Sequence, residues 1–202
     1  EMTSSLVGSE MCIRDRGGAV SRISMNLPNR LTLVRIALVP VYLVLLTGGE
    51  FCRWMAALVF SVAAITDLID GKIARKRGLV TDFGKFMDPI ADKLLVLLPF
   101  VYFCCESTQA DMIPVLLMIA REIIVSGFRL VAAGRGIVLA AGRSGKVKTA
   151  VQMIAVIMLT LVPPWPWLTT PAWIATWICG ALSVWSGWEI LWKNRQVLEE
   201  EA

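Results

Sequence analysis

The chain has no histidine among its 202 residues, and this absence removes several kinds of functional site. Histidine is the usual general base near neutral pH, the commonest neutral metal ligand and a member of Ser-His-Asp triads. Any chemistry must therefore use carboxylates, other bases, or metal ions held by oxygen. Charged residues are also scarce, at 18% of the chain against about 25% in soluble domains.

Cysteine is sparse as well, and its spacing excludes a zinc site. The five cysteines form no C-x-x-C pair, and most lie in or beside apolar runs. We expect them to be reduced and buried.

Apolar residues, in contrast, make up 56% of the chain, which indicates a protein whose solvent is lipid. About 20 residues of helix cross the hydrocarbon core of a bilayer. Six apolar segments of about that length lie near residues 31–47, 54–75, 84–105, 113–133, 147–163 and 172–192. We predict an all-α, polytopic membrane domain of six transmembrane helices over residues 25–202. Residues 1–24 are polar and lack the apolar run of a signal peptide, so we expect a disordered or non-native leader.

The distribution of positive charge predicts the orientation of these segments. Lysine and arginine gather before the first segment, between the second and third, between the fourth and fifth, and after the sixth. By the positive-inside rule, both termini and these connections face the cytoplasm. The same residues account for the net charge of +4, so we expect no nucleic-acid partner.

Four aspartates form the most informative pattern: Asp67, Asp70, Asp88 and Asp92. Their spacings of three and four residues place each pair on one helix face, and a short turn makes the two helices antiparallel neighbours. An aspartate at the centre of a membrane helix costs about 2.5–3.5 kcal/mol, so four together need a purpose. Two divalent cations would neutralise them, and oxygen ligands without histidine or cysteine favour Mg²⁺ or Mn²⁺, which suit displacement at phosphorus.

Two other readings of the aspartates stay open at this point. They could pair structurally with Lys72, Arg75 or Lys93, or they could line the cation pathway of a small transporter.

The aspartates belong to a longer motif, Asp-x-x-Asp-Gly-x-x-Ala-Arg-x8-Gly-x3-Asp-x3-Asp, which runs from Asp67 to Asp92. At every fixed position it resembles the signature of the CDP-alcohol phosphatidyltransferase family. The resemblance implies a dimeric, six-span helical enzyme that transfers a group from a CDP-linked lipid to an alcohol and releases CMP. It also implies metal ligation by Asp67, Asp70, Asp88 and Asp92, proton removal by Asp92, and CDP-lipid binding by Gly71, Ala74, Arg75, Thr81 and Gly84.

Three flanking segments, 26–35, 121–129 and 145–152, resemble the branch of that family that makes phosphatidylglycerophosphate. That likeness implies CDP-diacylglycerol as donor, glycerol 3-phosphate as acceptor and a place in a bacterial inner membrane; serine, inositol phosphate or phosphatidylglycerol are the alternative acceptors. The available cations for the acceptor phosphate are Arg121, Arg129, Lys146 and Lys148. Asn29 and Thr32 are candidate contacts of the CDP-lipid.

Each of these flanking residues also has a plainer interpretation. Asn29 and Thr32 could cap the first helix. Arg121 and Arg129 could pair with Glu122 or extend to the cytoplasm, and Lys146 and Lys148 could bind anionic headgroups.

Overall fold

The computed structural model describes residues 27–77, 82–106, 110–137, 139 and 142–196, except for the side chains of 27–29, 67–86 and 143. Every regular element in these ranges is helical. The elements are α2 (Leu27–Leu46), α3 (Glu50–Arg77), α4 (Asp82–Glu106), α5 (Met112–Gly134), α6 (Arg143–Leu161), the short 3-10 helix η1 (Pro166–Leu168) and α7 (Thr169–Lys193). The all-α prediction is confirmed, and each of the six predicted apolar segments corresponds to one of the six long helices. The leader expected at residues 1–24 lies outside the described residues.

The number of membrane-crossing helices is a separate matter from the number of helices. Over the described ranges, two helical stretches are long and apolar enough to cross a membrane by length and composition, Ser144–Leu161 and Pro166–Lys193. The six-helix architecture is therefore observed, whereas six transmembrane spans stay a prediction.

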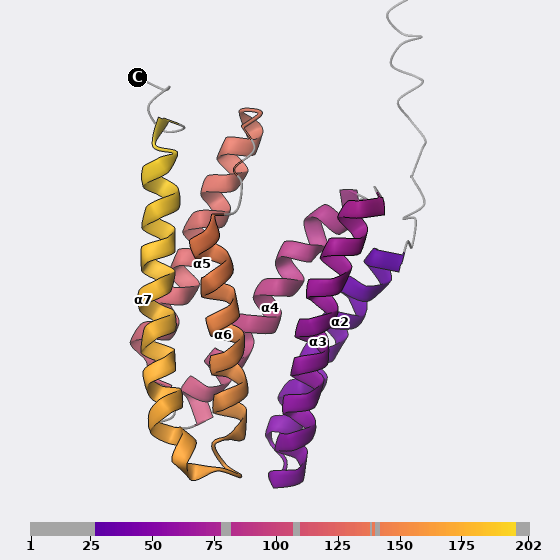
Figure 1. The fold of residues 1–202 in the computed structure, drawn as a ribbon, viewed down its shortest axis with the longest axis vertical. Coiled ribbons are helices and arrows are strands. Elements are labelled where there is room, and N and C mark those ends of the chain that lie inside the picture. Colours follow the sequence, from indigo (N-terminus) through magenta and orange to yellow (C-terminus); the bar gives the residue numbers. More distant parts are fainter. Residues whose placement is uncertain (1–26, 78–81, 107–109, 138, 140–141, 197–202) are drawn as a thin grey trace, which may run out of the picture.

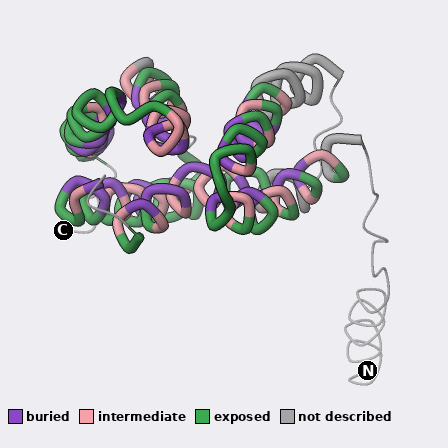
Figure 2. Tube along the Cα trace, turned by 90° about the horizontal axis from the view of Figure 1, so that it is seen from below, coloured by how far each residue is buried: buried purple, intermediate pink, exposed green. Residues whose placement is uncertain are grey.

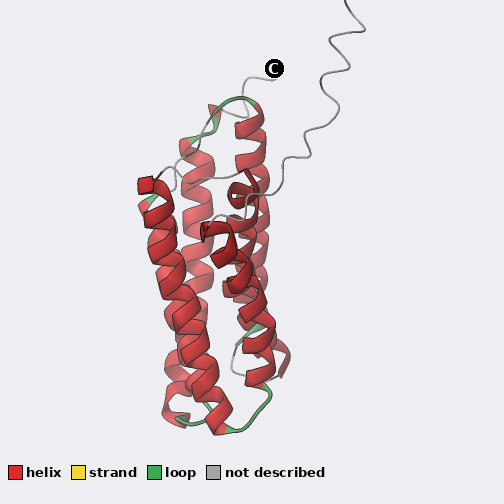
Figure 3. Cartoon of the chain, turned by 90° about the vertical axis from the view of Figure 1, so that its right-hand side faces the viewer, coloured by secondary structure: helices red, strands yellow, loops and turns green. Residues whose placement is uncertain are grey.

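The helices form two groups, which are joined by α4 and by the packing of α3 against α6. In Figure 1, α2 and α3 lie side by side, α5, α6 and α7 form the other group, and α4 runs obliquely between the two groups. The most extensive packing joins α7 to α5 and α6, and α2 to α3 and α4. Seen from the side, the long helices run along the length of the molecule (Figure 3).

The connections alternate between the two ends of the bundle. The start of α2, the end of α3, the start of α4, the end of α5, the start of α6 and the end of α7 lie at one end of the bundle, and the opposite ends of these helices lie at the other (Figure 1). The lysine-rich and arginine-rich connections are thus gathered at a single end, as the charge pattern predicts. We call this the basic end.

Two turns depend on glycine for different reasons. At Gly48, between α2 and α3, a Cβ atom would lie 2.5 Å from Cys52 Cβ, so only glycine lets the chain turn this tightly. At the end of α5, Gly136 has a φ of 72°. Its N–H donates to Ala133 O at 3.0 Å while the Ile137 N–H donates to Ala132 O at 2.9 Å. This is the Schellman arrangement, which satisfies carbonyls at a helix C-terminus.

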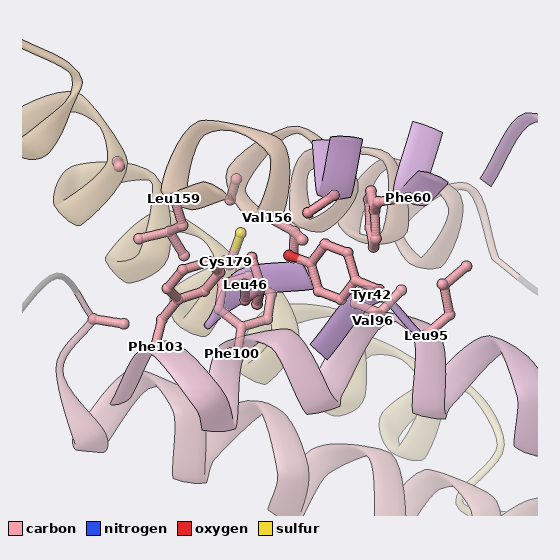
Figure 4. Packing of buried hydrophobic residues seen from close by; sticks show 14 of the residues in the cluster. Tyr42, Leu46, Phe60, Leu95, Val96, Phe100, Phe103, Val156, Leu159 and Cys179 are labelled. Atoms are coloured by element: carbon pink, nitrogen blue, oxygen red, sulfur yellow. The ribbon is translucent and has the colours of Figure 1, made fainter. Parts of the chain in front are cut away.

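The main core lies where the two groups of helices meet across α4. Aromatic side chains from α2, α3 and α4 fill it, together with aliphatic residues of α6 (Figure 4). Tyr42 is buried there, and its hydroxyl is 2.8 Å from the hydroxyl of Thr160 on α6. Since Thr160 also donates to Val156 O at 2.7 Å, both buried hydroxyls are hydrogen-bonded.

The outer surface is apolar while part of the interior is polar. Val44, Leu130 and Trp185 are 70%, 76% and 67% exposed, whereas Gln152 and Ser183 are buried. Figure 2 shows the buried parts of each helix turned toward neighbouring helices and the exposed parts turned outward. An apolar surface, with some polar side chains hydrogen-bonded between helices inside, is the pattern of helices packed in lipid.

The cysteine prediction is correct in part. Cys52, Cys104, Cys105 and Cys179 are free thiols. Cys179 is buried, but Cys105 is exposed near the end of α4, so the expectation that all are buried is wrong. Cys105 lies on the outward face of α4, so its side chain points away from the core.

Phe100 and its neighbour Val101 provide a test of the core. Phe100 is fully buried, whereas Val101 is 37% exposed. Truncating a buried phenylalanine costs about 3–5 kcal/mol, so Phe100→Ala should markedly lower the thermal unfolding midpoint in detergent. Val101→Ala should change that midpoint little. Equal losses in the two variants would contradict the packing described above.

Candidate functional site

Two aspartates of α4 meet two polar residues of α2 near the basic end. Asp88 and Asp92 lie one helical turn apart on α4. Thr32 Oγ1 donates to Asp88 Oδ1 at 2.5 Å, and Arg35 Nη1 donates to Asp92 Oδ1 at 2.9 Å. The Arg35 side chain is 4% exposed and the Asp92 side chain 47%, so a buried guanidinium holds a half-exposed carboxylate.

Thr32 and Arg35 change the picture drawn from the sequence. The capping alternative for Thr32 is wrong, because α2 begins at Leu27 and the Thr32 hydroxyl contacts Asp88 from inside the helix. In the sequence, Arg35 is the last residue of the flanking segment 26–35 and one of the basic residues that predict orientation, and it is not among the predicted site residues. Its spacing of three residues from Thr32, which places both on one helix face, was the available signal that it joins the aspartates.

The other predicted members of this site cannot be placed at the level of side chains. The side chains of Asn29, Asp67, Asp70, Gly71, Ala74, Arg75 and Gly84 lie outside the described residues, as does the whole of Thr81. The backbone places Asp67 and Asp70 on successive turns of α3 and Asp88 and Asp92 on α4. The convergence of all four carboxylates therefore stays a prediction.

The donors that are described suit a hard cation. Asp88 and Asp92 present carboxylate oxygens, and the Thr32 hydroxyl adds a further oxygen beside Asp88. An oxygen-only set of this kind fits Mg²⁺ or Mn²⁺ rather than softer metals. Within the described side chains, no three histidine, cysteine, aspartate or glutamate residues come together.

A second group of charges lies buried between α4, α5 and α6. Arg121 Nη1 donates to Glu122 Oε1 at 2.8 Å, and Lys148 Nζ of α6 pairs with the same oxygen. The side chains of Arg121, Glu122 and Lys148 are only 9%, 12% and 7% exposed. From α4, Lys93 Nζ donates to Ser126 Oγ, which donates to the Glu122 backbone oxygen at 2.5 Å. We call these five residues the charge cluster.

The charge cluster carries more positive than negative charge. Arg121, Lys148 and Lys93 contribute three cations, against the single carboxylate of Glu122. Buried charge that is not balanced is costly, so a further anion would be stabilised at this place. The cluster also adjoins the aspartates, because Lys93 follows Asp92 in α4.

The predicted phosphate-binding residues fall into two sets. Arg121 and Lys148 come together through Glu122, and the alternative pairing of Arg121 with Glu122 is confirmed. Arg129 and Lys146 are exposed, and neither makes an ion pair with a described residue. Sequence reasoning missed Glu122 as the shared partner and Lys93 as the link to α4.

Comparison with known proteins gives the family. The family model described as CDP-alcohol phosphatidyltransferase matches residues 25–185. The chain belongs to the CDP-alcohol phosphatidyltransferase family. The recognition made from the motif at residues 67–92 is thereby confirmed. Members of this family are membrane-integral transferases and generally depend on divalent cations.

Individual bacterial relatives in this family share one name, CDP-diacylglycerol–glycerol-3-phosphate 3-phosphatidyltransferase. The chain is 41% identical over 192 residues to the Bacillus subtilis protein, covering 86% of this chain and 97% of the relative. It is 45% identical over 141 residues to the Rickettsia felis protein, covering 69% of this chain and 77% of the relative. It is 37% identical over 169 residues to the Escherichia coli K12 protein, covering 81% and 92%.

Substitutions in the charge cluster test how much its ion pairs contribute to the stability of the protein. Glu122→Gln removes the carboxylate that two buried cations share, which should cost about 3–5 kcal/mol of stability. Adding Lys148→Met should cost less than the sum of the two single changes, with a coupling of about 0.5–3 kcal/mol. Thermal unfolding in detergent measures all three variants. Strict additivity would show that Glu122 and Lys148 do not interact, and Lys193→Met, on an exposed helix surface, serves as the control.

Proposed function

We propose that this protein transfers the phosphatidyl group of CDP-diacylglycerol to sn-glycerol 3-phosphate, giving phosphatidylglycerophosphate and CMP. The observation that carries the proposal is the match to the Bacillus subtilis relative over 97% of that protein's length, because its name states this donor and this acceptor. Relatives in Rickettsia and Escherichia coli carry the same name.

The acceptor is a dianion, and the charge cluster supplies what a dianion needs. Arg121 and Lys148 are buried beside one carboxylate, with Lys93 adding a further positive charge. A guanidinium and an ammonium bind phosphate by charge-assisted hydrogen bonds. We therefore assign the acceptor phosphate to Arg121 and Lys148, with the exposed Arg129 and Lys146 at the entrance.

The CDP-lipid is assigned to the helix pair α3 and α4. Asp67, Asp70, Asp88 and Asp92 would hold two divalent cations, Mg²⁺ or Mn²⁺. These ions would neutralise charge on the pyrophosphate and on the departing CMP. The nucleotide side of the site is assigned to Asn29, Thr32, Gly71, Ala74, Arg75, Thr81 and Gly84.

Asp92 is the proposed general base. Its carboxylate takes the proton of the attacking glycerol hydroxyl, whose oxygen forms a bond to the phosphatidyl phosphorus as the phosphorus–oxygen bond to CMP breaks. Arg35 orients this carboxylate through the bond at 2.9 Å. A single displacement suffices, because the site needs no second nucleophile for the atoms to balance.

The protein is proposed to span a bacterial inner membrane six times, with both termini and the site at the cytoplasmic face, as a homodimer. The basic connections all lie at the end of the bundle that carries Asp88 and Asp92, which supports this orientation (Figure 1). Glycerol 3-phosphate and CMP are water-soluble, so a site at the cytoplasmic face lets both exchange freely.

Release of CMP by the purified protein in detergent tests the function. With Mg²⁺ or Mn²⁺ present, release from CDP-diacylglycerol should require glycerol 3-phosphate. Asp92→Asn should lower the rate at least about 10²-fold, because general-base catalysis contributes 10²–10⁴-fold. Asp111→Asn, which removes a carboxylate that Trp173 and Trp177 contact at the other end of the bundle, should retain activity.

Two results would overturn parts of this proposal separately. Release of CMP only with serine, inositol phosphate or phosphatidylglycerol would keep the reaction type and refute the acceptor. Metal-dependent ion flux in vesicles without release of CMP would refute the transferase.

Fusions of a phosphatase that needs disulfide bonds test the orientation. Such a reporter is active only outside the reducing cytoplasm. Joined after Gly49, in the turn between α2 and α3, it should be active, and joined after Arg195 it should be inactive. The reverse result would place the proposed site on the wrong side of the membrane, and equal activities would contradict the alternation of the helices.

A further inference from the structure

Arg121 lies in a space that exists because residue 187 of α7 has no side chain. A Cβ atom on Gly187 would lie 2.9 Å from Arg121 Cγ, 3.6 Å from Nε and 3.8 Å from Cδ. The stem of the arginine therefore crosses α7 directly over this glycine. Arg121 Nε is buried there and has no hydrogen-bond partner among the described residues.

Glycine at this point is not explained by the helix itself. After proline it is the least favourable residue inside a helix, because it loses the most backbone freedom on folding. Gly187 is one of two glycines of α7 that face α5 in this way. At Gly180, two turns earlier, a Cβ atom would lie 2.8 Å from Pro114 Cβ. At both glycines, α5 approaches α7 to a similar distance. Gly180 faces a proline, however, whereas Gly187 faces a charged side chain.

Glu122 fixes the other end of the same arginine. Its Oε1 atom accepts from Arg121 Nη1 at 2.8 Å and also from Lys148 Nζ. One carboxylate oxygen thereby brings two cations of different helices side by side, which they would not do unaided because like charges repel. The Glu122 backbone oxygen is in turn held by Ser126 and, through Ser126, by Lys93 of α4.

We infer that Gly187 and Glu122 are positioning residues that orient Arg121 toward the phosphate of the acceptor. The inference rests on the proposed function, since it assigns Arg121 to that phosphate. The missing side chain of Gly187 leaves space for the aliphatic part of the Arg121 side chain against α7. Glu122 sets the direction of the guanidinium and its distance from Lys148. Neither residue needs to touch the acceptor.

Steady-state kinetics of Gly187→Ala and Gly180→Ala separate positioning from packing. Both variants add one methyl group between α5 and α7. Gly187→Ala should raise KM for glycerol 3-phosphate roughly tenfold or more, with kcat and KM for CDP-diacylglycerol changed much less, because one charged hydrogen bond to the acceptor is weakened. Gly180→Ala should leave KM for glycerol 3-phosphate unchanged, whatever it does to the thermal unfolding midpoint.

A double-mutant comparison shows whether Gly187 acts through Arg121. In an Arg121→Gln background, Gly187→Ala should raise KM no further. An unchanged KM in Gly187→Ala, an equal rise in Gly180→Ala, or an undiminished rise in the Arg121→Gln background would each overturn the inference. Where Gly187→Ala does not fold, Glu122→Asp, which keeps the charge and withdraws the carboxylate by one methylene, should raise the same KM.

The activity of the wild-type protein separates a failure of this inference from a failure of the proposed function. If it releases no CMP with glycerol 3-phosphate, the proposed function fails and the assignment of Arg121 fails with it. If the wild-type protein is active and Gly187→Ala has a normal KM, the proposed function stands and only the positioning role is refuted.

Discussion

The structure depends on one constraint, that a charge inside an apolar bundle must find an opposite charge. Lipid and packed side chains do not solvate ions, so an unpaired one is strongly destabilising. Two bridges meet this need, from Arg35 to Asp92 and from Glu122 to Arg121 and Lys148. Arg35–Asp92 ties α2 to α4 and Glu122–Lys148 ties α5 to α6, whereas Arg121 and Glu122 are neighbours in α5. The charged groups of the proposed site are therefore the same groups that hold these helices together.

Helix α4 gives these two bridges a common support. Asp92 is held by Arg35 of α2, while the next residue, Lys93, reaches Ser126 of α5. Successive residues of a helix point about 100° apart, so one turn of α4 serves both groups of helices at once. Any displacement of α4 would alter the proposed aspartate site and the charge cluster together. This coupling suits a reaction in which a hydroxyl and a phosphorus atom must meet, because the proposed donor and acceptor sites would keep a constant separation.

How much the sequence predicts differs between the fold and the site. The six helices follow from apolar segment lengths, and their alternation follows from the basic connections, because both are properties of the chain read in order. Asp88 and Thr32 could be expected near one another only through the resemblance to the family, which assigns the motif and segment 26–35 to one site. The contacts of Arg35, Lys93 and Gly187 could not be predicted from the sequence. They depend on which face of one helix meets which face of another, and hydropathy carries little of that information when helices are apolar on nearly every side.

The charge cluster shows why the sequence alone left two interpretations of Arg121 open. From the sequence, pairing with Glu122 and binding a phosphate are rival roles, since one carboxylate would satisfy one arginine. The structure removes the rivalry, because Glu122 is shared by two cations and a third cation lies behind Ser126. Counted over the described residues of the cluster, two positive charges therefore have no carboxylate of their own until an anion binds. A monoanion would leave one of them unbalanced, whereas a dianionic phosphate would balance both, and this arithmetic favours glycerol 3-phosphate over serine as the acceptor.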